Sequence, residues 1–245
     1  MHQIHFSRTS TIFELVNGVS VPFERGTFAN SSRAAQLLGI PELRQETSQN
    51  FSIGATFKAP ASGFRFTVDA YQVDIDDRII LTGNFSPGSN EELQSIFAQA
   101  GATGATFFSN AINTTSQGLD LVVSYNLSLG DGKSLDNSLA ATFSRTNAEQ
   151  DNNGNVIINA SPILEESGLV DTYFDQTSRI YLEQGVPRTK ITLGHNLNLG
   201  KFDIYLRNTL FGETTEATNE AIFDADLELL EGATIDPYNL SLIHI

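Results

Sequence analysis

Apolar and polar residues alternate along several stretches of this chain, each about ten positions long. A period of two is typical of a β-strand with one apolar and one polar face. About ten residues is also the length at which a tilted strand crosses the hydrocarbon layer of a membrane. The positions in the apolar phase form three pairs of stretches: Phe51, Ile53, Ala55 and Phe57 with Phe64, Phe66, Val68 and Ala70; Leu119, Leu121, Val123, Tyr125, Leu127 and Leu129 with Leu139, Ala141 and Phe143; and Ile191, Leu193, His195, Leu197 and Leu199 with Phe202, Ile204 and Leu206.

The connections between these stretches alternate between short and long. Short turns at 59–63, 130–134 and Gly200 close three predicted hairpins, whereas the segments 9–47, 84–106, 147–178 and from Glu213 onward are long. An antiparallel barrel in the outer membrane has short turns on its periplasmic side and long loops on its outer side. The predicted class is therefore all-β: an antiparallel transmembrane β-barrel segment.

Together with residues 1–8, counted as a strand, these stretches give about seven strands, too few to close a barrel of this kind. We therefore expect an open, curved sheet. Its two free edges should make the chain, taken alone, prone to aggregation and unable to transport.

Two irregularities are predicted along the chain. The apolar phase shifts from even to odd positions between Asp69 and Leu81, which indicates a β-bulge near Ala70 or Tyr71. Helix signals lie inside two of the long loops, at 89–101, where Ser89 or Asn90 can cap the helix, and at 31–39, which ends at a glycine.

Composition narrows the class further. The chain has 245 residues, 14 Lys plus Arg, 29 Asp plus Glu, a formal net charge of -15 and no Cys. This acidity argues against nucleic acid as a partner, and the absence of cysteine removes disulfides, thiolate metal sites and cysteine nucleophiles. No stretch approaches the roughly 18 consecutive apolar residues of a membrane-spanning helix, and residues 1–10 lack the apolar core of a signal peptide.

An ordered set of motifs resembles the barrels of TonB-dependent receptors. They are LLGIPELRQETSQNFSI at 37–53, DAYQVDIDDRIILT at 69–82, FFSNAINTTSQGLDLVVSY at 107–125, VPRTKITL at 186–193 and FDIYLRNTLFGE at 202–213. Each motif alone is weak, and their order carries the resemblance, which covers most of residues 1–216.

The resemblance implies a roughly 22-stranded barrel in the Gram-negative cell outer membrane, in contact with outer-membrane lipid. It also implies an N-terminal plug domain that couples to the TonB complex, and energised import of a small-molecule or oligosaccharide ligand, such as a siderophore–iron complex, cobalamin or a glycan. Plug, TonB-contacting segment and signal peptide are missing from this sequence. Residues 1–239 are predicted to be a partial barrel domain, truncated at both ends, and residues 240–245 a non-native tail.

The candidate chemistry is sparse. Asp74, Asp76 and Asp77 suggest either a Ca²⁺ site or carboxylates lining a water-filled lumen with Arg78 nearby. The second interpretation is favoured because the glycine and terminal glutamate of an EF-hand are missing. A structural role is favoured for the histidines because none has metal or nucleophile spacing: His2, His5, His195 and His244.

Two groups of charged residues suggest ligand contacts. Arg25, Arg33 and Arg44 of the loops could meet an anionic ligand, although exposed arginines are usually only solubilising. The late acidic residues could bind cations or bridge to lipopolysaccharide, although a solvated outer loop is favoured: Glu213, Glu216, Glu220, Asp224, Asp226, Glu228 and Glu231.

No catalytic, cofactor-binding or metal-ligating residue is predicted, and no individual ligand-binding residue is assigned. The chain is expected not to be an enzyme. A passive porin-like or structural outer-membrane barrel, and a secreted soluble β-protein that binds ligand in its loops, are the alternatives to energised import.

Two further sets of residues follow from the barrel prediction. One is an aromatic girdle near the short turns, formed by Phe57, Phe64, Tyr125 and Phe202. The other is a group of side chains expected to point into the lumen: Arg65, Thr67, Asp69, Asp120, Ser124 and Asn126.

Overall fold

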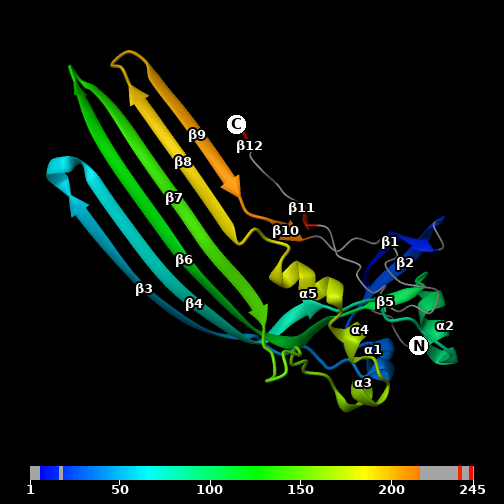
Figure 1. Ribbon diagram of the computed structural model, residues 1–245. Coiled ribbons are helices and arrows are strands. Elements are labelled where there is room, and N and C mark those ends of the chain that lie inside the picture. The colour runs from blue at the N-terminus through cyan, green and yellow to red at the C-terminus, as the bar shows by residue number, and fades with distance from the viewer. Residues whose placement is uncertain (1–5, 17–18, 216–236, 239–242, 245) are drawn as a thin grey trace.

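The computed structural model of the protein describes residues 6–16, 19–215, 237–238 and 243–244, and it is dominated by one long, curved antiparallel sheet (Figure 1). The strand order in this sheet is β12-β9-β8-β7-β6-β4-β3. Its members are β3 (Thr47–Ala59), β4 (Phe64–Leu81), β6 (Phe108–Gly130), β7 (Lys133–Ala148), β8 (Thr189–Asn198), β9 (Asp203–Phe211) and the two-residue β12 (Ile243–His244).

The three predicted hairpins are confirmed, with short turns at one end of the sheet and long connections at the other (Figure 1). The turn between β6 and β7 shows why the sequence specifies it. Asp131 and Gly132 both have positive φ, 52° and 73°, as a two-residue hairpin turn of type I′ requires. The β3–β4 turn is a single 3₁₀ turn, η1 (Pro60–Ser62), closed by Gly63.

The predicted bulge in β4 is wrong in position. Pairing with β6 is unbroken from Phe64 to Ile75, and the register shifts only between Ile75 and Ile79, where Asp77 has a φ of 53°. Since the strand does not change phase at Tyr71, its ring lies on the opposite face from Ala70. It packs there on Gly118 of the neighbouring strand.

We expect Gly118→Val to destabilise the sheet locally. A Cβ atom at Gly118 would lie 2.2 Å from Cζ of Tyr71, so the ring or the backbone must move. Overpacking of this kind costs about 1–3 kcal/mol, measurable as a lower urea midpoint of the detergent-folded protein. In a Tyr71→Ala background the same glycine substitution should cost much less, and an equal cost in both backgrounds would refute the steric explanation.

A second sheet forms where the sequence predicts a loop. Residues 9–47 were expected to be irregular and residues 1–8 a strand of the barrel. Instead β1 (Phe6–Val16) and β2 (Val19–Phe28) form an antiparallel hairpin, and β2 also pairs in parallel with β5 (Gly104–Thr106). The dipeptide Asn17–Gly18, a strong hairpin signal, stands between the two strands in the sequence.

Within the described ranges, five short helices lie at the long-loop end of the sheet (Figure 1). The two predicted helices are confirmed, with Ser32 capping α1, Asn90 capping α2 and Gly39 ending α1 at a φ of 74°. The other three lie within the long connection before β8 and were not predicted. The bounds are α1 (Arg33–Leu38), α2 (Glu91–Gln99), α3 (Pro162–Glu166), α4 (Val170–Tyr173) and α5 (Gln176–Glu183), and a two-stranded pair, β10 (Thr214–Thr215) with β11 (Pro237–Tyr238), follows β9.

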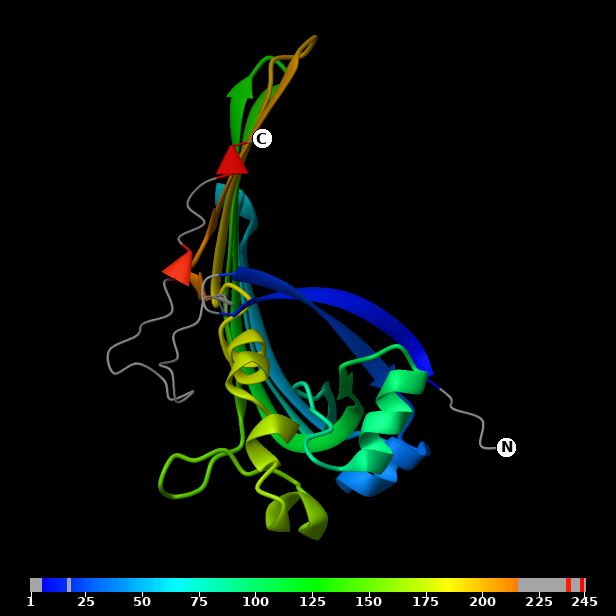
Figure 2. The same ribbon diagram turned by 90° about the vertical axis from the view of Figure 1, so that its right-hand side faces the viewer.

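These long connections fold around a buried apolar core. Phe28, Phe97 and Phe107 are at most 2% exposed. The ring centroid of Phe28 lies 5.5 Å from that of Phe97 and 6.2 Å from that of Phe107. We call this unit the cap, consisting of residues 19–46, 82–112 and 149–188. Figure 2 shows the sheet edge-on, with β1, β2, α1 and α2 on the side toward which the sheet curves. Most buried apolar side chains of the described chain therefore lie in the cap and not between sheets: Phe28, Ala34, Ala35, Leu38, Ile40, Phe85, Leu93, Phe97, Ala100, Ala102, Ala105, Phe107, Ala111, Ile112, Leu164, Tyr173 and Phe174, with Ala148 at the end of β7 packed against them.

Candidate functional site

One face of the sheet is apolar, and we call it the apolar face. The register aligns its side chains in rows across the strands, and large ones remain exposed, as for Ile53 at 65% and Leu206 at 54%. Such a face is stable only against an apolar solvent or partner. It comprises Ile53, Ala55, Phe57, Phe64, Phe66, Val68, Ala70, Leu119, Leu121, Val123, Tyr125, Leu127, Leu129, Leu135, Leu139, Ala141, Phe143, Ile191, Leu193, Leu197, Ile204, Leu206 and Leu210.

The height of this face matches a lipid bilayer. In β6 it runs from Leu119 to Leu129, and at about 3.4 Å per residue this is roughly 34 Å along the strand. A tilt of about 45° reduces that length to about 24 Å across the membrane. Outer-membrane barrels carry an apolar band about 25 Å tall. Beyond Leu119 the same face continues with Gln117 and Thr115, so the band ends there.

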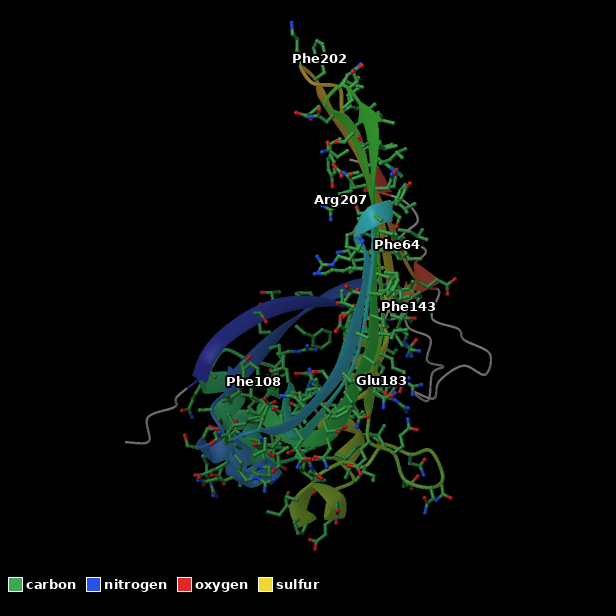
Figure 3. All side chains as sticks on the ribbon, turned by 90° about the vertical axis from the view of Figure 1, so that its left-hand side faces the viewer. Phe64, Phe108, Phe143, Glu183, Phe202 and Arg207 are labelled. Atoms are coloured by element: carbon green, nitrogen blue, oxygen red, sulfur yellow. The ribbon has the colours of Figure 1, made fainter. Side chains whose placement is uncertain are left out.

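The opposite face, which we call the polar face, carries charged and hydroxyl side chains. Arg65 is paired with Ser124, and Arg207 with Gly194, in one row that also includes Lys58. Nearer the cap, Asp69 is paired with Asp120, whose carboxylate accepts a hydrogen bond of 2.7 Å from Thr142. Figure 3 shows Arg207 and Phe64 on opposite sides of the sheet. The expected lumen residues thus share one face, on the side toward which the sheet curves: Arg65, Thr67, Asp69, Asp120, Ser124 and Asn126.

The predicted aromatic girdle is only partly assembled. The rings of Phe57 and Phe64 lie 6.5 Å apart, and Tyr125 is the register partner of Phe64. Phe202 lies at the turn of the β8–β9 hairpin, far from Phe64 (Figure 3). It is 71% exposed. The girdle prediction is wrong for this residue because the last hairpin extends its turn beyond that of the first.

The aspartates of β4 do not converge on one point. Asp74 lies on the face of Ala70, where it accepts hydrogen bonds of 2.7 Å from Gln72 and Thr115. Asp77, at the bulge, forms an ion pair of 2.7 Å with Arg44, and Arg78 donates to Thr114. The interpretation of this run as carboxylates that line a lumen is therefore wrong for Asp74, which lies in phase with the apolar face. Within the described ranges, no three His, Asp or Glu side chains are placed to hold a metal ion.

Two of the three predicted loop arginines, Arg33 and Arg44, pair with carboxylates in the structure. Arg33 donates two hydrogen bonds to Glu92, the shorter of 2.7 Å, which lowers the pKa of that carboxyl below its usual range. Arg44 is held by Asp77, and Arg25 lies within strand β2. The geometry therefore gives no support to Arg33 or Arg44 as free anion contacts.

The remaining candidates are the histidines and the late acidic residues, and most of their side chains lie outside the described residues. His195 faces the apolar side and its Nδ1 lies 2.7 Å from Oδ1 of Asn137, its cross-strand neighbour. Glu213 is exposed, whereas the side chains of His2, His5 and His244 and the acidic residues from Glu216 to Glu231 are outside the described part.

The cap contains an open cavity of about 460 Å³ beside α4 and α5. Its polar lining includes Asp171, Asp175 and Arg179. Asp175 caps α5 by accepting a hydrogen bond of 2.7 Å from Ser178, and Arg179 pairs with Glu183 at 3.2 Å. Phe174 supplies an apolar wall. The lining thus combines carboxylate, guanidinium and aromatic side chains.

Tyr173 links α4 to the buried part of β6. Its ring is fully buried and its hydroxyl forms a hydrogen bond with Ser109 Oγ. Burial raises the pKa of Tyr173 above the usual value of about 10. A raised pKa in the folded state means that the folded cap favours the neutral phenol of Tyr173. Its contribution to stability is therefore complete below a pH of about 10 and is lost as the pH rises through the pKa of the folded state.

We therefore expect the cap to lose structure in alkaline solution. Near-ultraviolet circular dichroism and tyrosinate absorbance, followed from pH 8 to 12, should change together in the parent protein. Tyr173→Phe should remove the steepest part of the transition, whereas Tyr181→Phe, at a residue 50% exposed, should leave it in place. An unchanged transition in Tyr173→Phe would contradict the assignment.

These features define a class of protein. An antiparallel sheet with one apolar and one polar face, short turns at one end and long folded connections at the other, has the architecture of an outer-membrane β-barrel. In the described part the sheet is open and does not close. None of the described helices is long and apolar enough to cross a membrane.

The family is established by comparison with known families. The family model described as "TonB dependent receptor-like, beta-barrel" matches residues 6–241, nearly the whole chain, and the chain belongs to this family. No individual curated protein matches it. The predicted family and fold class are thereby confirmed, and membership places the chain among outer-membrane receptors with a transport function.

Proposed function

We propose that this chain forms part of the barrel of a receptor that imports a scarce ligand across the Gram-negative outer membrane, with energy supplied through the TonB complex. The ligand belongs to the siderophore–iron, cobalamin or glycan class. The observation that carries the proposal is the polar face, which continues from the short turns to the cap along β4 and β6. A barrel closed around this face has a hydrated interior through which a polar ligand can pass.

The charges on the polar face support this function in two ways. The row that contains Lys58, Arg65 and Arg207 is basic, whereas the row nearer the cap contains Asp69 and Asp120. Side chains of both signs can hold a plug domain by ion pairs that water can exchange. The cavity beside α4 and α5 gives the outer end a surface suited to ligand capture.

Further parts of the proposal concern the chain as a whole. The protein acts without catalysis, as a multi-pass β-barrel in contact with outer-membrane lipid, and couples to TonB through an N-terminal plug region. Residues 1–239 constitute the barrel portion, and residues 240–245 are a non-native tail. The pairing of Ile243 and His244 with β9 is compatible with such a tail, because any short extended segment can add to a free strand edge.

Uptake measurements test the proposed function. Cells that lack the gene and cells that carry it would be supplied with radiolabelled ferric siderophore, cobalamin or oligosaccharide, with and without TonB. We expect uptake of one ligand class only when both the receptor and TonB are present. Equal uptake without TonB would show a passive pore instead, and absence of the protein from the outer-membrane fraction would favour a soluble ligand-binding protein.

A further inference from the structure

The connection that follows β7 begins with a tight hairpin turn. Gln150 and Val156 pair as an isolated antiparallel bridge, and the backbone N–H of Asp151 donates a hydrogen bond of 2.8 Å to the backbone oxygen of Asn155. Gly154 N–H donates one of 3.0 Å to the backbone oxygen of Asp151. Figure 2 shows this turn projecting from the sheet on the side opposite to α1 and α2. The residues between the bridged pair are all exposed to solvent.

Asn153 and Gly154 stand at the tip of this turn. Gly154 has a φ of 86°, and apart from its chain neighbours no heavy atom lies within 4 Å of the position that a Cβ atom would take. A glycine in open space leaves its nitrogen accessible and its backbone free to rotate. Loop tips of this kind open locally at little cost in free energy. The turn hydrogen bond of Gly154 therefore protects its nitrogen only weakly.

The Asp151 carboxylate is the one ionisable group within the turn. Its Oδ1 accepts the backbone N–H groups of Asn153 at 2.8 Å and of Asn155 at 2.9 Å. Hydrogen bonds from the backbone of Asn155 and then of Asn153 lower the pKa of Asp151 below its usual value, and the side-chain amides of both residues add to this effect. The carboxylate is therefore ionised at neutral pH, and the turn keeps the same hydrogen bonds from mildly acidic to mildly alkaline solution.

Only two asparagines of the sequence are followed by glycine, Asn17 and Asn153, and of these only Asn153 has a described side chain. Any larger following residue hinders the approach of its backbone nitrogen to the asparagine carboxamide. Asparagines followed by serine are moreover held by the fold. Asn137 lies within β7 with its Oδ1 2.7 Å from Nδ1 of His195, and Asn30 donates two hydrogen bonds, of 2.6 and 2.9 Å, to backbone oxygens.

We propose that Asn153 is a deamidation site, at which the turn converts without an enzyme into aspartate and isoaspartate. The Gly154 nitrogen loses its proton and forms a bond to Cγ of Asn153, while the Cγ–Nδ2 bond breaks. Ammonia leaves with that proton, and a succinimide ring remains. Water then adds to either carbonyl of the ring, so the chain continues through the backbone carbonyl carbon as aspartate or through Cγ as isoaspartate. The reaction is fast for its type because both partners are neighbours in one chain.

The reaction changes the lining of the cavity beside α4 and α5. Gly154 belongs to this lining together with Asp171 and Arg179, and Arg179 is already paired with Glu183. Either product adds a negative charge next to the cavity. Isoaspartate also inserts an extra carbon atom into the backbone before Gly154, which is incompatible with the present turn. The outer surface thus acquires two forms whose proportion changes with the age of the protein, and this goes beyond the proposed function because neither ligand nor TonB takes part.

Peptide mapping by mass spectrometry tests the inference on the full-length protein, purified in mild detergent and incubated at pH 6 and at pH 8. We expect Asn153 to convert to both aspartate and isoaspartate, faster at pH 8 because the attacking nitrogen must lose its proton. In oxygen-18 water each product should gain a heavy oxygen atom. Asn155 and Asn159, followed by valine and alanine, should convert at least about tenfold more slowly, a barrier difference of about 1.4 kcal/mol.

Two variants complete the design. Gly154→Ala should slow the conversion of Asn153 by a similar factor, and Asn153→Gln should remove the acidic species that anion-exchange chromatography resolves in the aged parent protein. Heat-modifiable migration of both variants controls for folding. The comparison with Asn155 needs no variant, so it stands even if alanine at the positive φ of Gly154 distorts the turn.

The opposite results overturn the inference. Conversion of Asn153 only in urea would show that the folded turn protects it, and equal rates at Asn153 and Asn155 would exclude a role for Gly154. Aspartate without isoaspartate would indicate direct hydrolysis of the side chain instead of a succinimide. Absence of the protein from the outer membrane would refute the proposed function but leave this result unaffected, since the reaction requires only the folded turn.

Discussion

Val123→Arg is expected to prevent stable assembly of the sheet in a membrane. Val123 lies near the middle of the apolar stretch of β6, between Phe66 and Leu139 in the same row. An arginine on the lipid face of a barrel costs about 2–4 kcal/mol near the bilayer midplane. We expect a correspondingly lower unfolding free energy in urea, and loss of the heat-modifiable species in outer-membrane fractions.

The neighbouring residue offers a matched control. Val122 is also a valine of β6, but it lies on the polar face opposite Thr67 and Ala140 and is 45% exposed. Val122→Arg introduces the same side chain one position away, where water and carboxylates can solvate it. It should cost about 1 kcal/mol or less. Similar losses for both variants would mean that the two faces do not meet different solvents.

Phe107→Ala should unfold the cap while leaving the sheet intact. Phe107 is fully buried, with the ring of Phe28 at 6.2 Å and that of Phe85 at 5.9 Å. Removing a buried phenylalanine side chain costs about 3–5 kcal/mol. Because the cap has its own core, we expect the loss to appear as faster hydrogen exchange and protease cleavage in residues 82–112 and 149–188. Exchange in β7 and β8 should stay slow.

Phe108→Ala supplies the comparison. Phe108 follows immediately in the chain, but its side chain points away from the core and is 48% exposed (Figure 3). The same deletion there should change cap exchange by less than about 1 kcal/mol. Equal effects of the two substitutions would show that the cap lacks the packed core described above, and simultaneous unfolding of the sheet would show that cap and sheet form one cooperative unit.

The sequence predicted the membrane-facing part of the fold well because each strand repeats a simple local rule. Alternation identified both strands of each hairpin, and Gly63, Gly132 and Gly200 mark turns that only a few residue types allow. Sorting of the connections by length then gave the orientation of the sheet. Neither inference required knowledge of contacts between distant residues.

The cap was not predicted, because its core is built from residues far apart in the chain. Phe28, Phe97 and Leu164 belong to three separate connections, and each alone resembles an apolar residue in a loop. The signal available was the dipeptide Asn17–Gly18 followed by alternating residues at 19–24, together with several phenylalanines in segments expected to be solvated. The position of the β4 bulge was missed for a related reason. The apolar residues Tyr71 and Val73 were interpreted as the start of a shifted phase that follows a bulge, whereas Tyr71 keeps the phase of the strand and packs on a glycine of the polar face.

For the candidate sites too, features that depend on local alternation could be predicted, and features that depend on contacts between distant residues could not. The residues of the polar face could be assigned from alternation alone, as Thr67, Asp69 and Asp120 illustrate. The partners of Arg33 and Arg44 could not, since Glu92 and Asp77 lie 59 and 33 positions away in the sequence.

Strand β6 runs without interruption for 23 residues, with Ala111 and Ile112 inside the cap and Leu119 to Leu129 at the level of the bilayer. The cap is consequently joined to the sheet by a continuous strand and not by a flexible linker. It cannot swing aside as a lid unless the hydrogen bonds that join β6 to β4 and β7 are broken. In the proposed importer, the ligand therefore meets a cap that is fixed to the barrel wall and does not open as a hinged lid.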